Sequence, residues 1–343
     1  MRGKRCVVRI YDYLSAVFRF SAYLCSQMKT TLSSLIATLC WLTAVFSVVS
    51  TCSCKGREVA VDPEVERLTA ACRIDSTTLR TILNPDSIEG FEQLSSLSAQ
   101  AWILVDDSTG MILSQKYADE PRAIASLTKM MTCLLALENG VMTDTVSITE
   151  DVFIAKDSRV KLGDAYVMDD LIYEMMLQSD NDAAYAIAKH IGGDTLRFCD
   201  MMNQKAAYLG MKNTHFANPN GMPNYENYSS ASDVLTLARY CMRDSAFAAI
   251  VGTVEKDIPL IDRRHMPIKN TNMLLEKYEG CIGIKTGFTR MAGNCLASAA
   301  RRNGSTLYLV LLGSRSMSSR FSESIILLDY GFRVMEELNH LSK

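Results

Sequence analysis

Three short motifs place nucleophilic, basic and amide side chains in a fixed order along the 343-residue chain. They are S-x-x-K at residues 126–129, S-D-N at residues 179–181 and K-T-G at residues 285–287. Each motif alone arises by chance, but the ordered set of three has a chance level of roughly one in a hundred. The set is therefore the first place to look for catalysis by a serine nucleophile.

Ser126 and Lys129 are the candidate nucleophile and base. A serine hydroxyl attacks a carbonyl only when a base takes its proton, and a desolvated lysine has a lowered pKa and can be neutral. A spacing of three residues places both side chains on one face of a helix. At a helix N-terminus, the backbone N–H of Ser126 would also be free to stabilise an oxyanion. The alternative interpretation is an N-cap serine with a solvated lysine.

The second motif presents a hydroxyl and an amide just before a predicted helix. Ser179 is a candidate proton relay to a leaving amine, and Asn181 is a candidate ligand for a substrate carbonyl and for the Lys129 side chain. Asp180 is expected to be structural or exposed to solvent. For this tripeptide alone, an ordinary helix cap is an equally good interpretation.

The third motif lies in a predicted strand. Lys285 and Thr286 are expected to bind a substrate carboxylate through charge-assisted hydrogen bonds. Gly287 is expected to leave room for the substrate backbone, so that an extended peptide adds to this strand as an extra partner. The alternative is an exposed lysine on an edge strand.

Strands are predicted at both ends of the region that holds the motifs. Residues 101–105 and 111–114 form a predicted hairpin around the turn at 106–110, and later strands are predicted at 283–285, 294–302 and 306–312. Helical periodicity predicts helices at 126–137, 168–178, 181–190, 196–209, 231–243 and 319–338. We therefore expect an α/β (α+β) fold, in which one antiparallel sheet is flanked by helices and accompanied by a mostly helical subdomain.

The sequence around the motifs resembles the D-alanyl-D-alanine carboxypeptidases, which are low-molecular-weight penicillin-binding proteins and serine peptidases. The resemblance covers about Ser98 to Gly331 and is carried by I-A-S-L-T-K-M-M-T at 124–132, N-P-N-G-M-P at 218–223, G-I-K-T-G-F-T at 283–289 and A-G-N-C-L at 292–296. It implies a β-lactamase/transpeptidase-like fold. It also implies that a peptidoglycan stem peptide ending in D-Ala-D-Ala acylates the serine and that hydrolysis then releases the last D-Ala.

The resemblance assigns a role to each motif residue in this chain. It implies that Ser126 is the nucleophile and Lys129 the base, that Ser179 and Asn181 act as the second motif, and that the backbone N–H of Phe288 completes the oxyanion hole. The implied binding site for the substrate and its terminal carboxylate consists of Lys285, Thr286 and Gly287. β-Lactam antibiotics are the implied covalent inhibitors.

Asp180 makes a class A β-lactamase the nearest alternative enzyme, because many carboxypeptidases have glycine at this position. A β-lactamase of this class needs a deacylating glutamate, but the region between the second and third motifs offers only Glu226-Asn227 and no Glu-x-x-x-Asn pattern. A non-hydrolytic sensor or wall-binding module is an alternative of a different class, although no second hydrophobic span accompanies the motifs. A transpeptidase would use the same acyl-enzyme.

Composition excludes several other classes of protein. The formal net charge of −2 provides no basic field for nucleic acid, and 48% hydrophobic residues argue against disorder. The cysteines of the body form no C-x-x-C pair or Cys/His cluster, so we expect no metal and no cofactor, and we expect most of them to be buried. They are Cys72, Cys133, Cys199, Cys241, Cys281 and Cys295.

The N-terminal region has the layout of an export signal. Residues 32–50 are uncharged and mostly apolar, and Met28 is the expected true start because the charged region of a signal is normally short. The residues before Cys52 resemble a bacterial lipobox, so Cys52 or Cys54 is a candidate for lipidation. Plain cleavage and a retained membrane anchor are the alternatives. We expect an exported protein of the periplasm or cell envelope.

These patterns divide the chain into three expected regions. Residues 1–54 are the targeting or anchor region, residues 55–97 are a polar linker, and residues 98–338 are the penicillin-binding, transpeptidase-like catalytic domain. Many carboxypeptidases of this type continue into a C-terminal β-rich domain. Only twelve residues follow Gly331, so we expect that domain to be absent and any membrane tether to be N-terminal.

Overall fold

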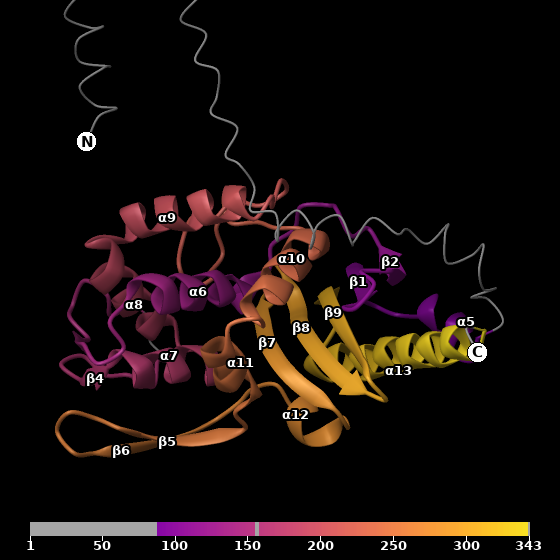
Figure 1. The fold of residues 1–343 in the computed structure, drawn as a ribbon. Coiled ribbons are helices and arrows are strands. Elements are labelled where there is room, and N and C mark those ends of the chain that lie inside the picture. Colours follow the sequence, from indigo (N-terminus) through magenta and orange to yellow (C-terminus); the bar gives the residue numbers. More distant parts are fainter. Residues whose placement is uncertain (1–87, 155–157, 342–343) are drawn as a thin grey trace, which may run out of the picture. The chain divides into compact units, whose positions relative to one another are not determined.

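A five-stranded antiparallel sheet brings together two segments that are far apart in the sequence (Figure 1). The structure is a computed structural model that describes residues 88–154 and 158–341. The strand order is β2-β1-β9-β8-β7. The strands are β1 (Ala101–Asp106), β2 (Ile112–Lys116), β7 (Cys281–Thr289), β8 (Gly293–Arg302) and β9 (Ser305–Ser314). The prediction of one antiparallel sheet is confirmed, and β1 of the first hairpin pairs with β9 from the other end of the region.

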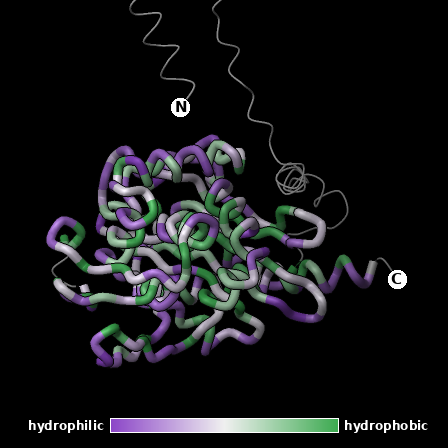
Figure 2. The backbone as a smooth tube through the Cα atoms, turned by 60° about the vertical axis from the view of Figure 1, so that its left-hand side comes forward, coloured by the Kyte–Doolittle hydropathy of each residue, from purple (hydrophilic) through white to green (hydrophobic). Residues whose placement is uncertain are grey.

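Both faces of this sheet are buried. Successive residues of a strand point to opposite faces, and in β1 Ile103 and Val105 belong to one hydrophobic cluster while Trp102 and Leu104 belong to another. The second cluster is covered by α13 (Met317–Leu341), along which hydrophobic and hydrophilic residues alternate (Figure 2). The sheet is therefore the middle layer between α13 and the helical subdomain.

The helical subdomain supplies the first two catalytic motifs. α10 (Ala231–Cys241) contacts β9 and β1 and so connects it to the sheet. The other helices are α6 (Lys129–Asn139), α7 (Met168–Leu177), α8 (Asn181–Gly192), α9 (Thr195–Tyr208) and α11 (Ser245–Gly252). Four of these helices begin after a side chain that accepts a backbone N–H of the first turn, which explains where they start. The capping residues are Asp180, Asp194, Ser230 and Asp244.

Several short elements lie outside the predicted pattern. They are α5 (Phe91–Leu94), the hairpin of β3 (Thr145–Ser147) and β4 (Ala165–Val167), the hairpin of β5 (Glu255–Pro259) and β6 (His265–Lys269), and α12 (Leu274–Lys277). Elements of three to five residues are too short for helical or strand periodicity to be recognised. The β5–β6 hairpin is seen in Figure 1 as a ribbon beneath the helices.

The helix predicted to begin at Ser126 begins differently. Residues Ala125–Thr128 form a 3₁₀ turn, η2, and the α-helix α6 starts only at Lys129. Ala125 has a φ of 49°, in the left-handed region, so the chain cannot enter the turn as a regular α-helix. Ser126 and Lys129 thus face each other across the junction of two kinds of helix.

The end of the predicted linker packs against the body of the protein. Ile88, Leu94 and Leu97 are buried in the same cluster as α13, and Arg333 donates a hydrogen bond to the carbonyl of Glu89 at 2.9 Å. Residues 1–87 lie outside the described residues, and with them the export segment, Met28, Cys52, Cys54 and Cys72. Within residues 88–154 and 158–341 no helix is long and apolar enough to cross a membrane.

Candidate active site

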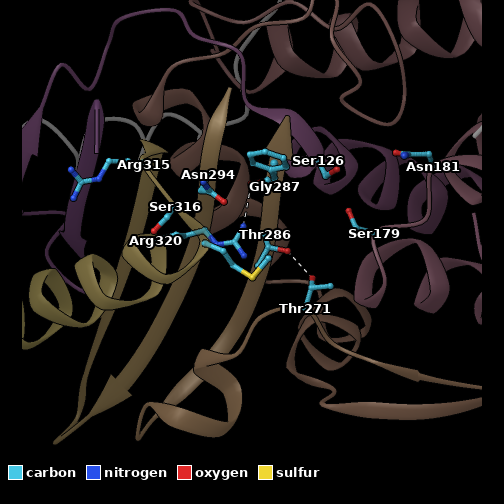
Figure 3. A pocket seen from close by; sticks show the side chains of 12 residues that line it. Ser126, Ser179, Asn181, Thr271, Thr286, Gly287, Asn294, Arg315, Ser316 and Arg320 are labelled. Carbon is cyan, nitrogen blue, oxygen red and sulfur yellow. Dashed lines mark hydrogen bonds between the residues drawn. The ribbon is translucent and has the colours of Figure 1, made fainter. Parts of the chain in front are cut away.

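A cavity of about 740 Å³ opens where the three motifs meet (Figure 3). η2 contributes Ser126, the loop before α8 contributes Ser179, the first residue of α8 is Asn181, and β7 contributes residues 286–288. The remaining lining residues are Thr271, Asn294, Arg315, Ser316, Met317 and Arg320. Lys129 and Lys285 are at most 1% exposed. The lining residues run from Ser126 to Arg320, so side chains up to 194 positions apart in the sequence are gathered into one site.

The Lys129 ammonium nitrogen lies at the centre of this site. Its Nζ is 3.0 Å from the Oγ of Ser126, 2.9 Å from the Oδ1 of Asn181 and 2.8 Å from the carbonyl oxygen of Asn220. Burial lowers the pKa of Lys129 to about 7, and the nearby charge of Asp180 opposes part of this shift. A large fraction of Lys129 is neutral at pH 7, with a lone pair available for the hydroxyl proton of Ser126.

Two glycines allow η2 to lie close to its neighbours. A Cβ on Gly287 would be 3.0 Å from the backbone nitrogen of Ser126, and a Cβ on Gly221 would be 1.9 Å from the carbonyl oxygen of Ala125. Gly287 was expected to leave room for a substrate backbone. In the structure it first of all leaves room for η2, which brings Ser126 against the edge of β7.

The second motif combines a strained serine with a capping aspartate. Ser179 has a φ of 64°, which is uncommon for a residue with a side chain. The buried Asp180 accepts hydrogen bonds from the backbone nitrogens of Asp182 and Ala183 and from the hydroxyl of Ser158. Asp180 therefore holds the loop in place, while Ser179 and Asn181 face the cavity together with Ser126 (Figure 3).

The third motif lies on the edge strand of the sheet. β7 pairs only with β8 in the described sheet, so its other edge faces η2 and the cavity. Burial, together with the positive charges of Lys129 and Arg320, lowers the pKa of Lys285 well below its usual range. The hydroxyl oxygens of Thr286 and Thr271 are 2.6 Å apart. The edge of β7 is thus open to an extended ligand and is lined by donors.

Arg320 is a site residue that the sequence reasoning missed. It comes from α13, is 4% exposed, and its Nη1 donates to the carbonyl oxygens of Gly287 and Cys295 at 3.2 and 3.4 Å. Its buried Nε has no hydrogen-bond partner among the described residues, and burial lowers its pKa to about 10. The guanidinium therefore stays charged at neutral pH. The buried face of α13 near Arg320 also carries Glu323 and Ser324, so helical periodicity offered no clear signal for Arg320.

The charge of the cavity favours an anion. Its lining contains two arginines and no acidic side chain, so a carboxylate of the ligand would be the natural partner of Arg320. The same lining offers no glutamate that could activate a water for deacylation in the manner of a class A β-lactamase.

The described cysteines and acidic residues suggest no additional chemistry. Cys133, Cys199, Cys241 and Cys295 are buried free thiols whose pKa is raised by burial, as expected for apolar packing. Over residues 88–154 and 158–341, no group of three or more His, Cys, Asp and Glu side chains is placed to hold a metal ion.

Comparison with known proteins identifies the family. Residues 89–316 match the sequence model of the D-alanyl-D-alanine carboxypeptidases. The chain belongs to this family. Similarity to the carboxypeptidase DacF of Bacillus subtilis is 32% identity over 245 residues, which is 69% of this chain and 63% of DacF. The chain thus spans less than two thirds of the length of DacF. The carboxypeptidase of Streptomyces strain K15 is 34% identical to this chain over 256 residues, which cover 88% of the Streptomyces protein.

Solved structures of the family share the fold. The DD-transpeptidase of Streptomyces K15 superimposes with a TM-score of 0.65 at 33% sequence identity, covering 69% of this chain and 97% of that protein. The carboxypeptidase DacD of Francisella tularensis gives a TM-score of 0.64 at 31% identity, covering 73% of this chain and 72% of DacD. The predicted β-lactamase/transpeptidase-like fold is confirmed.

Proposed function

We propose that the protein is a serine-type D-Ala-D-Ala carboxypeptidase, which removes the terminal D-alanine from peptidoglycan stem pentapeptides through an acyl-enzyme on Ser126. The observation that carries the proposal is the contact between Ser126 Oγ and Lys129 Nζ at 3.0 Å, with the lysine buried and its pKa near 7. A neutral amine at this distance is the base that a serine nucleophile needs. The names of the family and of its relatives support the same activity.

Acylation begins when neutral Lys129 takes the proton of Ser126 as Oγ attacks the carbonyl carbon of the penultimate D-alanine. The backbone N–H groups of Ser126 and Phe288 are the proposed donors to the oxyanion. The C–N bond then breaks, and a proton passes from Lys129 through the hydroxyl of Ser179 to the departing amine. Water hydrolyses the ester in a second step and regenerates Ser126.

The carboxylate of the terminal D-alanine is placed among Thr286, Lys285 and Arg320. This assignment is supported by the burial of both cationic side chains, by the unpartnered Nε of Arg320 and by the absence of an acid from the cavity lining. Asn181, already bound to Lys129, is the proposed ligand of the substrate amide. The substrate then lies along the free edge of β7, as the K-T-G motif predicts.

Turnover of a synthetic stem pentapeptide tests the proposal. Wild-type protein should release D-alanine steadily, and Ser126→Ala should release none while keeping the wild-type thermal unfolding temperature. Ser126 makes no side-chain cap bond to η2, so its hydroxyl contributes little to folding. Sustained D-alanine release by Ser126→Ala would assign the nucleophile to another residue.

Transpeptidation is a second candidate, because the Streptomyces K15 relative carries the name carboxypeptidase in one comparison and DD-transpeptidase in the other. The two reactions share the acyl-enzyme and differ in whether water or an amine resolves it. Adding a D-amino acid or a second stem peptide to the assay distinguishes them. A new peptide product in place of the hydrolysed tetrapeptide would indicate the transpeptidase.

The substrate implies a place in the cell envelope. Peptidoglycan lies outside the cytoplasmic membrane, and we infer that the protein is exported by its N-terminal segment. Lipidation at Cys52 or Cys54 is the proposed tether, and β-lactam antibiotics are the proposed covalent inhibitors. Detergent-phase partitioning of wild type but not of a Cys52→Ala, Cys54→Ala double variant is the expected result for a lipoprotein. Equal partitioning of the two proteins would favour a retained apolar anchor.

A further inference from the structure

A second cavity, of about 330 Å³, lies next to the active site. Its lining comes from the segment before η2, from the connection between α9 and α10, and from the turn between β7 and β8. The lining residues are Pro121, Arg122, Ala123, Asn224, Tyr225, Asn227, Tyr228 and Met291. None of these residues lines the catalytic cavity, yet two of the contributing segments continue directly into it through Ser126 and Phe288.

The second cavity is within reach of a substrate bound at Ser126. Arg122 precedes Ser126 by four residues, so their Cα atoms are at most about 15 Å apart. The three to four residues of a stem peptide that precede its acylated residue span about 10–13 Å when extended. The amino end of a bound stem peptide therefore reaches the position of the second cavity.

The direction of the bound peptide also points to this cavity. With the carboxylate at Lys285 and Thr286 and the reacting carbonyl at Phe288, the substrate runs antiparallel to β7. Its amino end then passes Thr289 and approaches the β7–β8 turn, where Met291 forms one wall of the second cavity. In peptidoglycan this end of the stem peptide is joined to a sugar of the glycan strand.

The lining has the chemistry of a site for a neutral, hydroxylated ring. Tyr225 is 88% exposed, so the face of its aromatic ring is accessible to the apolar face of a sugar. The Arg122 guanidinium is held by Gln100 and Glu120, to which its Nη1 and Nη2 donate at 3.0 and 2.5 Å, whereas its Nε has no hydrogen-bond partner among the described residues. The Asn224 side chain adds further polar groups. The lining includes no acidic residue, and apolar walls with a few directed donors are typical of small-ligand sites.

The frame of the cavity is rigid and is joined to the catalytic segment. Arg122 and Ser229 exchange two backbone hydrogen bonds of 2.8 and 2.9 Å. The loop at residues 224–227 is closed by a hydrogen bond of 3.0 Å from the backbone nitrogen of Asn227 to the carbonyl oxygen of Asn224. The Asn227 side chain also donates a hydrogen bond to the hydroxyl of Thr128 in η2 at 3.2 Å. A ligand in this cavity thus meets a preformed surface and loses little free energy to ordering the protein.

We propose that the second cavity is a carbohydrate subsite, which holds the N-acetylated sugar to which the stem peptide is attached. This inference rests on the proposed carboxypeptidase function and extends it, because it makes glycan-linked stem peptides better substrates than free ones. Tyr225 supplies the stacking surface, Arg122 and Asn224 supply hydrogen bonds, and Met291 closes the side next to the catalytic cavity.

The test compares a free stem pentapeptide with the same pentapeptide joined to N-acetylmuramic acid. Attachment of the sugar should raise kcat/KM of the wild-type protein by about tenfold, which is the gain expected from one well-formed ring contact. Tyr225→Ala should lose this gain and keep wild-type activity on the free pentapeptide. Tyr225→Phe should keep most of the gain in kcat/KM, because the aromatic ring remains. Leu196→Ala is the control variant and should behave as wild type, because Leu196 is exposed and lines neither cavity.

Two results would overturn the subsite. One is equal kcat/KM for the two substrates with wild-type protein, and the other is an equal loss on both substrates in Tyr225→Ala, which would assign the cavity to the peptide. If neither substrate is turned over, the carboxypeptidase proposal fails, and the subsite is then judged by calorimetric binding to the Ser126→Ala variant. There, binding of the muramyl pentapeptide about tenfold tighter than the free pentapeptide supports the subsite, and equal binding rejects it.

Discussion

At the scale of single residues, the environment of Lys129 sets the pH dependence of the reaction. Its pKa of about 7 means that the base becomes protonated, and so inactive, as the pH falls below neutrality. We expect kcat/KM for a stem peptide to rise about tenfold per pH unit below this pKa and to level off above it. A series of initial rates between pH 5.5 and 9 measures this, and a flat profile would contradict the assignment of Lys129 as the base.

The Lys129→Arg variant is the companion test. Guanidinium keeps the charge and approximate length of the side chain but stays protonated at every usable pH. This variant should therefore be nearly inactive even at pH 9, where the wild type is most active. Activity within tenfold of wild type would show that the side chain acts through its charge alone.

The two buried cationic side chains, Arg320 and Lys285, differ in how strongly their surroundings affect their charge. Arg320 stays charged at neutral pH, whereas burial and two neighbouring positive charges lower the pKa of Lys285 well below its usual range. We expect Arg320→Gln to raise KM for a peptide with a free terminal carboxylate by about tenfold or more and to have little effect on the amidated peptide. The amidated peptide serves as the control. An equal rise in KM for both peptides would indicate that Arg320 has a structural role at β7.

At the scale of elements, helix α7 contains an unusual carboxyl group. Glu174 is fully buried, neither of its oxygens has a hydrogen-bond partner among the described residues, and its one ion pair is a distant 3.8 Å contact with Arg159. Burial and the charge of Asp180 raise the pKa of Glu174 to about 8, while Arg159 opposes this shift. Glu174 is therefore mostly protonated in the folded protein at neutral pH.

A raised pKa of this kind makes stability fall as the pH rises. The folded state holds the proton of Glu174 up to about pH 8, whereas the unfolded chain releases it near the ordinary glutamate pKa, so stability is lost between those two values. We expect Glu174→Gln to be more stable than wild type at pH 8, by on the order of a few kcal/mol, and not at pH 4.5.

Urea unfolding at the two pH values measures this difference. Glu337→Gln, an exposed substitution on α13, is the matched control and should follow the wild type at both pH values. If Glu174→Gln and wild type lose stability in parallel as the pH rises, another group is responsible.

At the scale of the whole molecule, the lining of the cavity, which comes from residues 126–320, bears on the choice between a carboxypeptidase and a β-lactamase. Its lining holds no carboxylate that could activate water against a β-lactam ester. The opened ring stays attached and obstructs water, whereas a departing D-alanine leaves that path open. We expect a one-to-one penicilloyl adduct on Ser126 that persists for minutes, next to continuous release of D-alanine from a pentapeptide.

Intact-mass spectrometry after incubation with penicillin detects this adduct. The Ser126→Ala variant should gain no mass, which assigns the label to the nucleophile. Rapid hydrolysis of penicillin by the wild type, with no adduct at any time, would instead favour a β-lactamase.

The order and composition of the motifs were readable from the sequence because they depend on local spacing. The spacing of Ser126 and Lys129 and the strand context of Lys285 follow from periodicity and short-range geometry. The single antiparallel sheet was inferred from strands at both ends of the region with helices between them. The structure differs from the sequence prediction at the start of the helix expected from Ser126. Ala125 adopts a left-handed conformation, so a 3₁₀ turn replaces the first turn of that helix.

Only the tertiary structure could decide what surrounds each group. A Cβ on Gly287 would lie 3.0 Å from the backbone nitrogen of Ser126 in η2. Arg320 donates to the carbonyl of Gly287 from α13, a helix that begins 30 residues after the K-T-G motif ends. The pKa of Lys129 likewise depends on burial and on the charge of Asp180, which is distant in sequence. Motif spacing determines which side chains are available, whereas desolvation and close backbone contacts exist only once distant elements have packed together.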